Sequence, residues 1–202
     1  MVRIYPAIST HPCPSFMPKV VDRIQYRAEL LDRCFPLFAE WGYAAITMRQ
    51  IAQGLGVSTG TLYHYFEGKQ EIFEQMVLAR IESDFRELSD QLLALGTVQE
   101  RVEAVFDYFH HAQDEMFREL SLYLEYYHYT QTIGQASNNI LHEVFERLEP
   151  EIETVMGIRN KTAGQLLFSS IDGLMIARIY GCNVDWTAQG KLLGRLLSHV
   201  DE

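Results

Sequence analysis

The sequence has little of what marks membrane-spanning and secreted proteins. Its residues contain no uncharged apolar run of about 18, the length that a membrane-spanning helix needs. The N-terminus has no basic segment followed by an apolar one, which argues against an export signal. The three cysteines, Cys13, Cys34 and Cys182, are odd in number for a disulfide framework and too far apart for a metal site. We therefore expect a cytoplasmic protein without a metal or a cofactor.

The alternation of apolar and polar residues that marks strands is also missing. Apolar residues instead recur at helical spacing, which predicts an all-α protein of about nine helices. The predicted helices span residues 20–41, 48–55, 59–66, 68–95, 97–115, 116–129, 137–156, 162–181 and 185–200. Pro36 falls inside the first of them, and because proline removes a backbone hydrogen bond we expect a kink there.

Residues 1–19 hold four of the six prolines and show no helical pattern, which predicts an N-terminal arm. Its two basic residues, Arg3 and Lys19, leave contact with a DNA minor groove open as one alternative. Met17 is a second candidate start of translation besides Met1.

Residues 47–69 have the spacing of two short helices joined by a glycine turn. Thr47 and Ser58 are favourable N-cap residues, and Gly56 stands where the turn needs a residue that tolerates positive φ. Ala52 has only a methyl group, which lets the two helices approach closely. This is the spacing of a helix-turn-helix, whose second helix meets base edges through its N-terminal end.

The segment 30–73 resembles the N-terminal domain of TetR-type transcriptional regulators. The resemblance rests on Trp41-Gly42-Tyr43, Thr-x-Arg-x-Ile-Ala, Leu-Gly-Val-Ser, Gly-Thr-Leu-Tyr-His-Tyr-Phe and Gly68-Lys69. It implies a DNA-binding domain over residues 20–67 and an effector-binding and dimerisation domain over residues 68–202. It also implies a homodimeric, one-component regulator without enzymatic activity. We expect a repressor that releases a palindromic double-stranded operator when a small effector binds.

The resemblance also assigns residues to DNA contact. The assigned residues, with the N-cap Ser58 among them, are Thr47, Arg49, Ser58, Thr59, Gly60, Thr61, Tyr63, His64 and Lys69. Arg49 can donate two hydrogen bonds to guanine, and Thr59 and Thr61 can reach base edges. Thr47, Tyr63, His64 and Lys69 are the expected phosphate contacts, which set register without reading sequence. The alternative for Tyr63 and His64 is that they are ordinary exposed residues.

The formal net charge of −10 is unevenly distributed along the chain. Residues 1–70 hold seven Lys/Arg against five Asp/Glu, a charge of +2, and residues 71–202 carry −12. Phosphates would be repelled everywhere except at the N-terminal domain. The alternative is that the acidic helix faces only keep the protein soluble.

Aromatic residues are concentrated in the predicted middle helices. They predict a pocket for an apolar or aromatic effector, with tyrosine hydroxyls as the orienting polar groups. The residues that we assign to this pocket are Phe106, Phe109, Phe117, Tyr123, Tyr126, Tyr127, His128 and Phe145. The alternative for each of them is ordinary core packing.

The last two predicted helices carry apolar stripes and several glycines that permit close helix packing. The resemblance implies that these helices pair with their copies in a four-helix bundle. The residues that we assign to this interface are Leu167, Ile171, Leu174, Arg178, Leu193, Leu196 and Leu197. The alternative is that both stripes belong to the internal core.

Two other functional classes compete with the regulator. Glu125-x-x-His128 and Asp107-x-x-His110 have the spacing of a di-metal helical-bundle enzyme, but the sequence offers no clear partner ligands for them. A helical adaptor that has lost DNA binding is the third class, and the intact polar face of the second helix argues against it.

Overall fold

The computed structural model describes residues 23–134 and 140–200, without the side chains of Ile140, Leu141 and Phe145. Helices joined by turns and loops, with no strand, make up the described residues, which confirms the all-α fold class. The helices are α1 Arg23–Asp32, α2 Phe35–Trp41, α3 Met48–Leu55, α4 Thr59–Tyr65, α5 Lys69–Leu93, α6 Val98–Thr132, α7 Ile140–Met156, α8 Lys161–Ile179 and α9 Trp186–Leu197. Within these ranges no helix is long and apolar enough to cross a membrane. The predicted arm, residues 1–19, lies outside the described residues.

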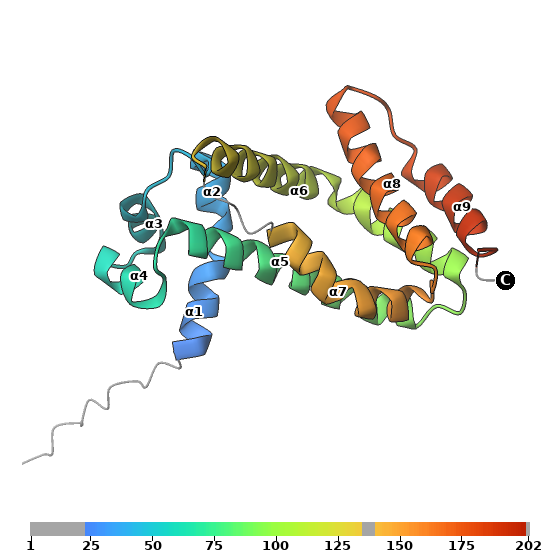
Figure 1. The fold of residues 1–202 in the computed structure, drawn as a ribbon, viewed down its shortest axis with the longest axis horizontal. Coiled ribbons are helices and arrows are strands. Elements are labelled where there is room, and N and C mark those ends of the chain that lie inside the picture. The colour runs from blue at the N-terminus through green and yellow to red at the C-terminus, as the bar shows by residue number, and fades with distance from the viewer. Residues whose placement is uncertain (1–22, 135–139, 201–202) are drawn as a thin grey trace, which may run out of the picture.

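Figure 1 shows a small head, α1 to α4, at one end of an elongated molecule. Helix α5 leads from the head into the body, and α7 packs along it. Helix α6 returns from the far end to the head, with α9 packed on its N-terminal half and the end of α6 against α2. Helices α8 and α9 form the end of the body away from the head.

The predicted first helix is interrupted rather than kinked. It divides into α1 and α2, and Arg33 and Cys34 form the turn between them. The Cys34 backbone N–H donates to the Leu31 carbonyl at 3.0 Å, and Pro36 lies in the first turn of α2. Proline is favourable there because first-turn N–H groups have no partner inside a helix. The proline thus starts a new helix.

The predicted boundary between residues 115 and 116 is wrong, since α6 is one helix of 35 residues. Thr97 and Glu100 form a capping box at its start. No glycine or proline occurs between Val98 and Thr132, so no residue type ends the helix before Gly134, which has a φ of +67°. Among the described residues the number of helices matches the prediction only because one predicted helix divides and two others merge.

The buried residues form two cores. One lies in the head and includes Phe38, Tyr43 and Leu62, together with Phe73 from α5 and Tyr126 from the end of α6. The other lies in the body, where α6, α7, α8 and α9 meet. Because α5 and α6 contribute residues to the first core, the head packs directly against these two helices. The domain limits at residues 19 and 67 stay predictions.

Candidate nucleic-acid interface

The two short helices of the head are fixed by local caps. The Thr47 Oγ1 accepts a hydrogen bond from the Gln50 N–H at 3.3 Å, and the Gln50 Oε1 accepts one from the Thr47 N–H at 3.0 Å. Gly56 has φ and ψ of +73° and +29°, the left-handed conformation that glycine adopts without strain. The Ser58 Oγ accepts from the Thr61 N–H at 2.9 Å and begins α4. The structure therefore forms the predicted helix-turn-helix.

The head buries one face of this unit and exposes the other. Ile51, Ala52, Leu55 and Leu62 are at most 3% exposed. On the opposite side Arg49, Gly60 and His64 are exposed, Tyr63 is 57% exposed, and Thr59 is partly exposed. The N-terminal end of α4 is thus an open polar surface, as the approach to a major groove requires.

Three assigned hydroxyl residues already hold the helix ends. The Thr47 Oγ1 lies 2.7 Å from the Gln50 Oε1. The Ser58 and Thr61 hydroxyl oxygens are 2.8 Å apart. Caps of this kind orient the helices and leave little freedom for these hydroxyls to reach DNA. The residues whose polar groups remain open toward the exposed face are Arg49, Thr59, Tyr63 and His64.

The side chain of Lys69 is turned away from the exposed face, which corrects its expected role as a phosphate contact. Its Nζ donates to the carbonyls of Tyr43, Ala44 and Ile46 at 2.7, 3.1 and 3.0 Å. The ammonium group also lies 4.7 Å from the centre of the Tyr43 ring. Because an ammonium has three N–H donors, all of them are used. Lys69 ties the start of α5 to the loop before α3.

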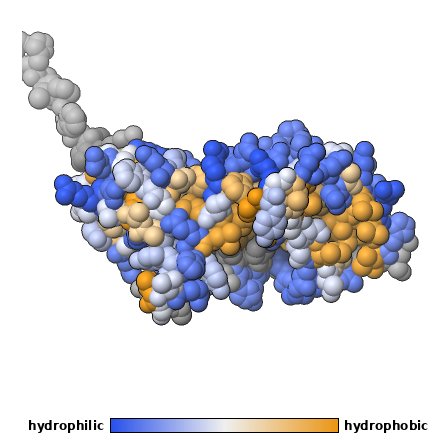
Figure 2. Space-filling view, turned by 90° about the horizontal axis from the view of Figure 1, so that it is seen from above, coloured by the Kyte–Doolittle hydropathy of each residue, from blue (hydrophilic) through white to orange (hydrophobic). Residues whose placement is uncertain are grey.

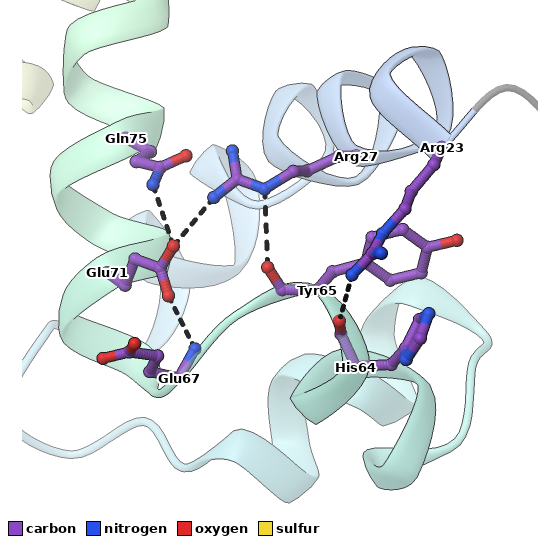
Figure 3. Close-up of polar contacts among 7 residues, drawn as sticks. All are labelled: Arg23, Arg27, His64, Tyr65, Glu67, Glu71 and Gln75. Atoms are coloured by element: carbon purple, nitrogen blue, oxygen red, sulfur yellow. Dashed lines mark hydrogen bonds and ion pairs between the residues drawn. The ribbon is translucent and has the colours of Figure 1, made fainter.

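Arginines of α1 hold the C-terminal end of α4, as Figure 3 shows. Arg23 Nη2 donates to the His64 carbonyl at 3.2 Å, and Arg27 Nε donates to the Tyr65 carbonyl at 3.4 Å. Arg27 also pairs with Glu71 of α5 at 2.8 Å, and Glu71 accepts from the Glu67 N–H at 2.6 Å. Positive groups are stabilising at the negative end of a helix dipole.

Our sequence reasoning missed these contacts. The three arginines concerned, Arg23, Arg27 and Arg33, all lie in the predicted helix 20–41, but their spacing does not name their partners. Arg33 Nη2 donates to the Leu55 carbonyl at the end of α3, at 2.9 Å. The three arginines account for much of the positive charge of the head, but they hold helices together and are only in part available to phosphates.

The end of α6 is attached to the head by polar and aromatic contacts. The Glu125 Oε1 accepts a hydrogen bond from the Ala44 N–H at 3.0 Å. The Tyr126 hydroxyl donates to the Glu74 carboxylate of α5, and its ring meets the Tyr43 ring edge-on at 4.7 Å. Burial raises the pKa of Tyr43 to about 12. The loop that begins the helix-turn-helix is thus held by both α5 and α6.

The residues assigned to an effector pocket do not meet at one site. Phe106, Phe109 and Phe117 belong to the body core, where the Phe109 ring stacks on Trp186 at 6.4 Å. Tyr123 and Tyr126 belong to the head core. Tyr127 and His128 are exposed, and the side chain of Phe145 lies outside the described part. For the buried residues the structure favours core packing.

Three hollows in the described body lie elsewhere. One of about 250 Å³ lies between α7 and α8, one of about 840 Å³ between α5 and α7, and one of about 340 Å³ between α5 and α6. None of the seven assigned residues with described side chains lines any of them.

Most of the residues assigned to a dimer interface lie inside the chain. Leu167, Ile171, Leu193 and Leu197 are at most 9% exposed in the body core, so the assignment of these four needs correction. Leu174 packs partly buried against the same core, and Arg178 pairs with Asp114. Leu196, 56% exposed, is the one assigned residue with a largely open side chain. Most of the assigned residues are buried because α8 and α9 each have two apolar stripes, and the assignment fell mainly on the stripe that packs into the body core.

The outer stripes form an exposed apolar face on α8 and α9. Figure 2 shows a broad hydrophobic area at this end of the molecule. Its large residues are 41–79% exposed: Leu166, Ile176, Ile179, Tyr180, Leu192, Leu196 and Val200. Exposed apolar areas of this kind mark association surfaces. We call these seven residues the α8–α9 face.

The acid-histidine pairs that suggested a metal enzyme do not form a metal site in the described residues. No group of three or more His, Cys, Asp or Glu in these residues could hold a metal ion. Glu125 instead bonds to Ala44, and His128 is exposed.

The fold and the exposed face define an all-helical protein with an N-terminal helix-turn-helix. Residues 30–76 match the model of the family described as "Bacterial regulatory proteins, tetR family". The matched residues, 47 of 202, cover the helix-turn-helix and the start of α5, so this part of the chain is similar to the DNA-binding segment of the TetR family.

The chain is also similar to individual proteins. It is 34% identical over 80 residues to the HTH-type transcriptional repressor KstR2 of Mycobacterium tuberculosis, which is 40% of each chain. The putative transcriptional regulator SCO7518 of Streptomyces coelicolor superposes with a TM-score of 0.67 at 24% identity, over 86% of this chain and 99% of that one. The regulator FadR of Bacillus subtilis, in complex with stearoyl-CoA, superposes with a TM-score of 0.57 at 20% identity, over 85% and 97%.

Proposed function

We propose that this protein is a homodimeric DNA-binding transcriptional regulator that responds to a small ligand and acts as a repressor. The observation that carries the proposal is the geometry of α3 and α4, with their apolar sides buried and their polar side open. The matched part of KstR2, a repressor, supports the same class.

Arg49 is the candidate for reading bases. Its guanidinium is on the exposed side of α3, where two parallel N–H groups can bond to O6 and N7 of one guanine. Thr59 and Gly60 at the start of α4 allow close approach to the groove. Tyr63 and His64, one turn further, are candidates for phosphate contacts that set register.

Dimerisation through the α8–α9 face completes the binding unit. One short recognition helix buries too little surface for tight specific binding, so two heads are needed. A twofold dimer places its two heads on symmetric half-sites, and the operator would be palindromic. The acidic body, with −12 on residues 71–202, would keep phosphates at the heads.

A ligand would act through the helices that hold the head. Helix α7 packs on α5, and α5 and the end of α6 hold the loop before α3. A ligand that binds one arrangement of the body more tightly than another would change the spacing of the two heads. That the FadR structure contains stearoyl-CoA supports a small-molecule effector for this fold.

Selection of bound sequences from random duplex DNA tests the proposal. We expect a twofold-symmetric motif, and we expect Arg49→Ala to relax the preference at one base pair of each half-site by about 1–3 kcal/mol. Arg86→Ala, which removes an exposed arginine of α5 in the body, is the matched control and should leave the motif unchanged. A dimeric protein that enriches no motif would contradict the proposal.

A further inference from the structure

The hollow between α7 and α8 has an apolar floor. Met156, Ile158 and Leu167 line it and are 4%, 2% and 1% exposed, so they form a closed base. Ile152 and Phe168 line it as partly exposed side walls. At about 250 Å³ the hollow suits the apolar part of a small ligand.

The rim of this hollow is acidic. Glu146, Glu149 and Glu153 follow one another on α7 at spacings of three and four residues, which places them on one side of the helix. Among the described lining residues Lys161 is the only Lys or Arg, and its Nζ lies 2.8 Å from the Glu149 Oε1. Glu149, and more weakly Glu153 and Glu146, raise the pKa of Lys161. The Glu146 Oε1 also lies 3.3 Å from the Nε2 of His142, a contact that is an ion pair only when the imidazole is protonated. Among the described residues, Glu146 and Glu153 are therefore the rim carboxylates without an ion pair to Lys or Arg.

The residues that line the two other hollows also carry a net negative charge. The hollow between α5 and α7 is lined by Glu82, Asp90 and Glu151 against Arg86 and Arg147.

The hollow between α5 and α6 has four acidic residues and one arginine, Arg80, which pairs with Glu119 and Glu115. With Lys161 counted, each of the three hollows has more carboxylates than cations. An anionic ligand such as an acyl-CoA would meet repulsion in every one of them.

We propose that the α7–α8 hollow binds a small hydrophobic cation. Its ammonium or amidinium head lies between Glu146 and Glu153, and its apolar part lies on Ile152 and Phe168. Glu149 stays paired with Lys161 at the edge. The hollow combines an apolar floor with an excess of carboxylates at the rim, and a hydrophobic cation satisfies both parts.

The role of this site as the effector site rests on the proposed function, whereas binding of the cation does not. Helix α7 forms one wall of the hollow and also packs on α5, which leads to the head. A ligand that separates α7 from α8 would therefore act on the helix that carries Lys69.

Titration calorimetry of the full chain, without DNA, tests the site. The probes are octyltrimethylammonium and octanoate, which share a tail and differ in the sign of the head group. We expect the cation to bind at least about tenfold more tightly than the anion. Tighter binding of octanoate would overturn the inference.

Three variants locate the site. Glu146→Gln with Glu153→Gln should weaken binding of the cation about tenfold. The control, Glu143→Gln with Glu151→Gln, makes the same change in charge on exposed residues of α7 outside this hollow. It should leave the affinity for the cation unchanged. Gly164→Leu should block the hollow, since a Cβ at Gly164 meets no atom within 4 Å and the helix gains a better helix former. Circular dichroism shows that each variant is folded.

The outcomes separate this inference from the proposed function. The site would be overturned if the two double glutamate variants weakened binding of the cation equally. It would also be overturned if the folded Gly164→Leu variant bound the cation as tightly as the unchanged protein. Release of the operator by octanoate, from a protein that does not bind the cation, would overturn the site and leave the regulator intact. Cation binding that depends on Glu146, Glu153 and Gly164 in a protein without a DNA motif would support the site and contradict the regulator.

Discussion

Replacement of Lys69 by methionine separates a structural role from a DNA contact. Lys69→Met keeps much of the aliphatic stem and removes the three N–H donors that reach the carbonyls of Tyr43, Ala44 and Ile46. Hydrogen bonds to a charged group each contribute about 1.5–3 kcal/mol, but those to Tyr43 and Ile46 are only part-buried, the one to Ala44 is exposed, and they share one ammonium. Burial lowers the pKa of Lys69, so desolvation offsets part of the gain. We expect a net loss of about 2 kcal/mol of unfolding free energy.

A loss of this size lowers the melting temperature by about 4–8 °C in a chain of this length. Chemical denaturation gives the free energy, and the salt dependence of DNA binding gives the number of phosphates neutralised. If Lys69 only ties the loop, Lys69→Met lowers stability and affinity while the salt slope of the folded protein stays the same.

Lys191→Met is the matched control, because Lys191 is exposed on α9. It should leave both stability and the salt slope unchanged. An unchanged melting temperature in Lys69→Met, together with a slope reduced by about one ion, would refute our reasoning and restore the phosphate contact.

Three further predictions concern the body and the head. Leu192→Glu with Leu196→Glu should give a monomer in sedimentation, while Lys191→Glu, which makes the same total change in charge on another side of α9, leaves the dimer intact; a dimeric double variant would contradict the interface. Gly190→Ala should lose about 1–2 kcal/mol of unfolding free energy, because its Cβ would lie 2.8 Å from the Phe106 Cβ, whereas Gly164→Ala should lose none. Stability should fall as the pH rises above about 10, because the folded pKa of Tyr43 is raised to about 12, and Tyr43→Phe should reduce the slope in alkaline denaturation.

Whether a predicted site residue is buried or exposed depends on which face of its helix packs against another helix. Leu166 and Leu167 are adjacent in an apolar run, yet Leu166 is 49% exposed and Leu167 only 1%. Periodicity identifies an apolar helix but does not say which of two stripes meets the core. Phe106 and Tyr126 are both buried residues of α6, but they pack into different cores, so an aromatic-rich helix does not by itself indicate one shared pocket.

The sequence by itself determined the helix-turn-helix. The caps of Thr47 and Ser58 and the turn at Gly56 involve residues within about four positions of one another, so residue type decides them. The tertiary structure alone decided the roles of residues that act at a distance. Lys69 reaches back to residues 43–46, Arg23 and Arg27 reach forward to α4, and Glu125 meets Ala44, 81 residues away. A long polar side chain has many reachable partners, and only the packed helices select one.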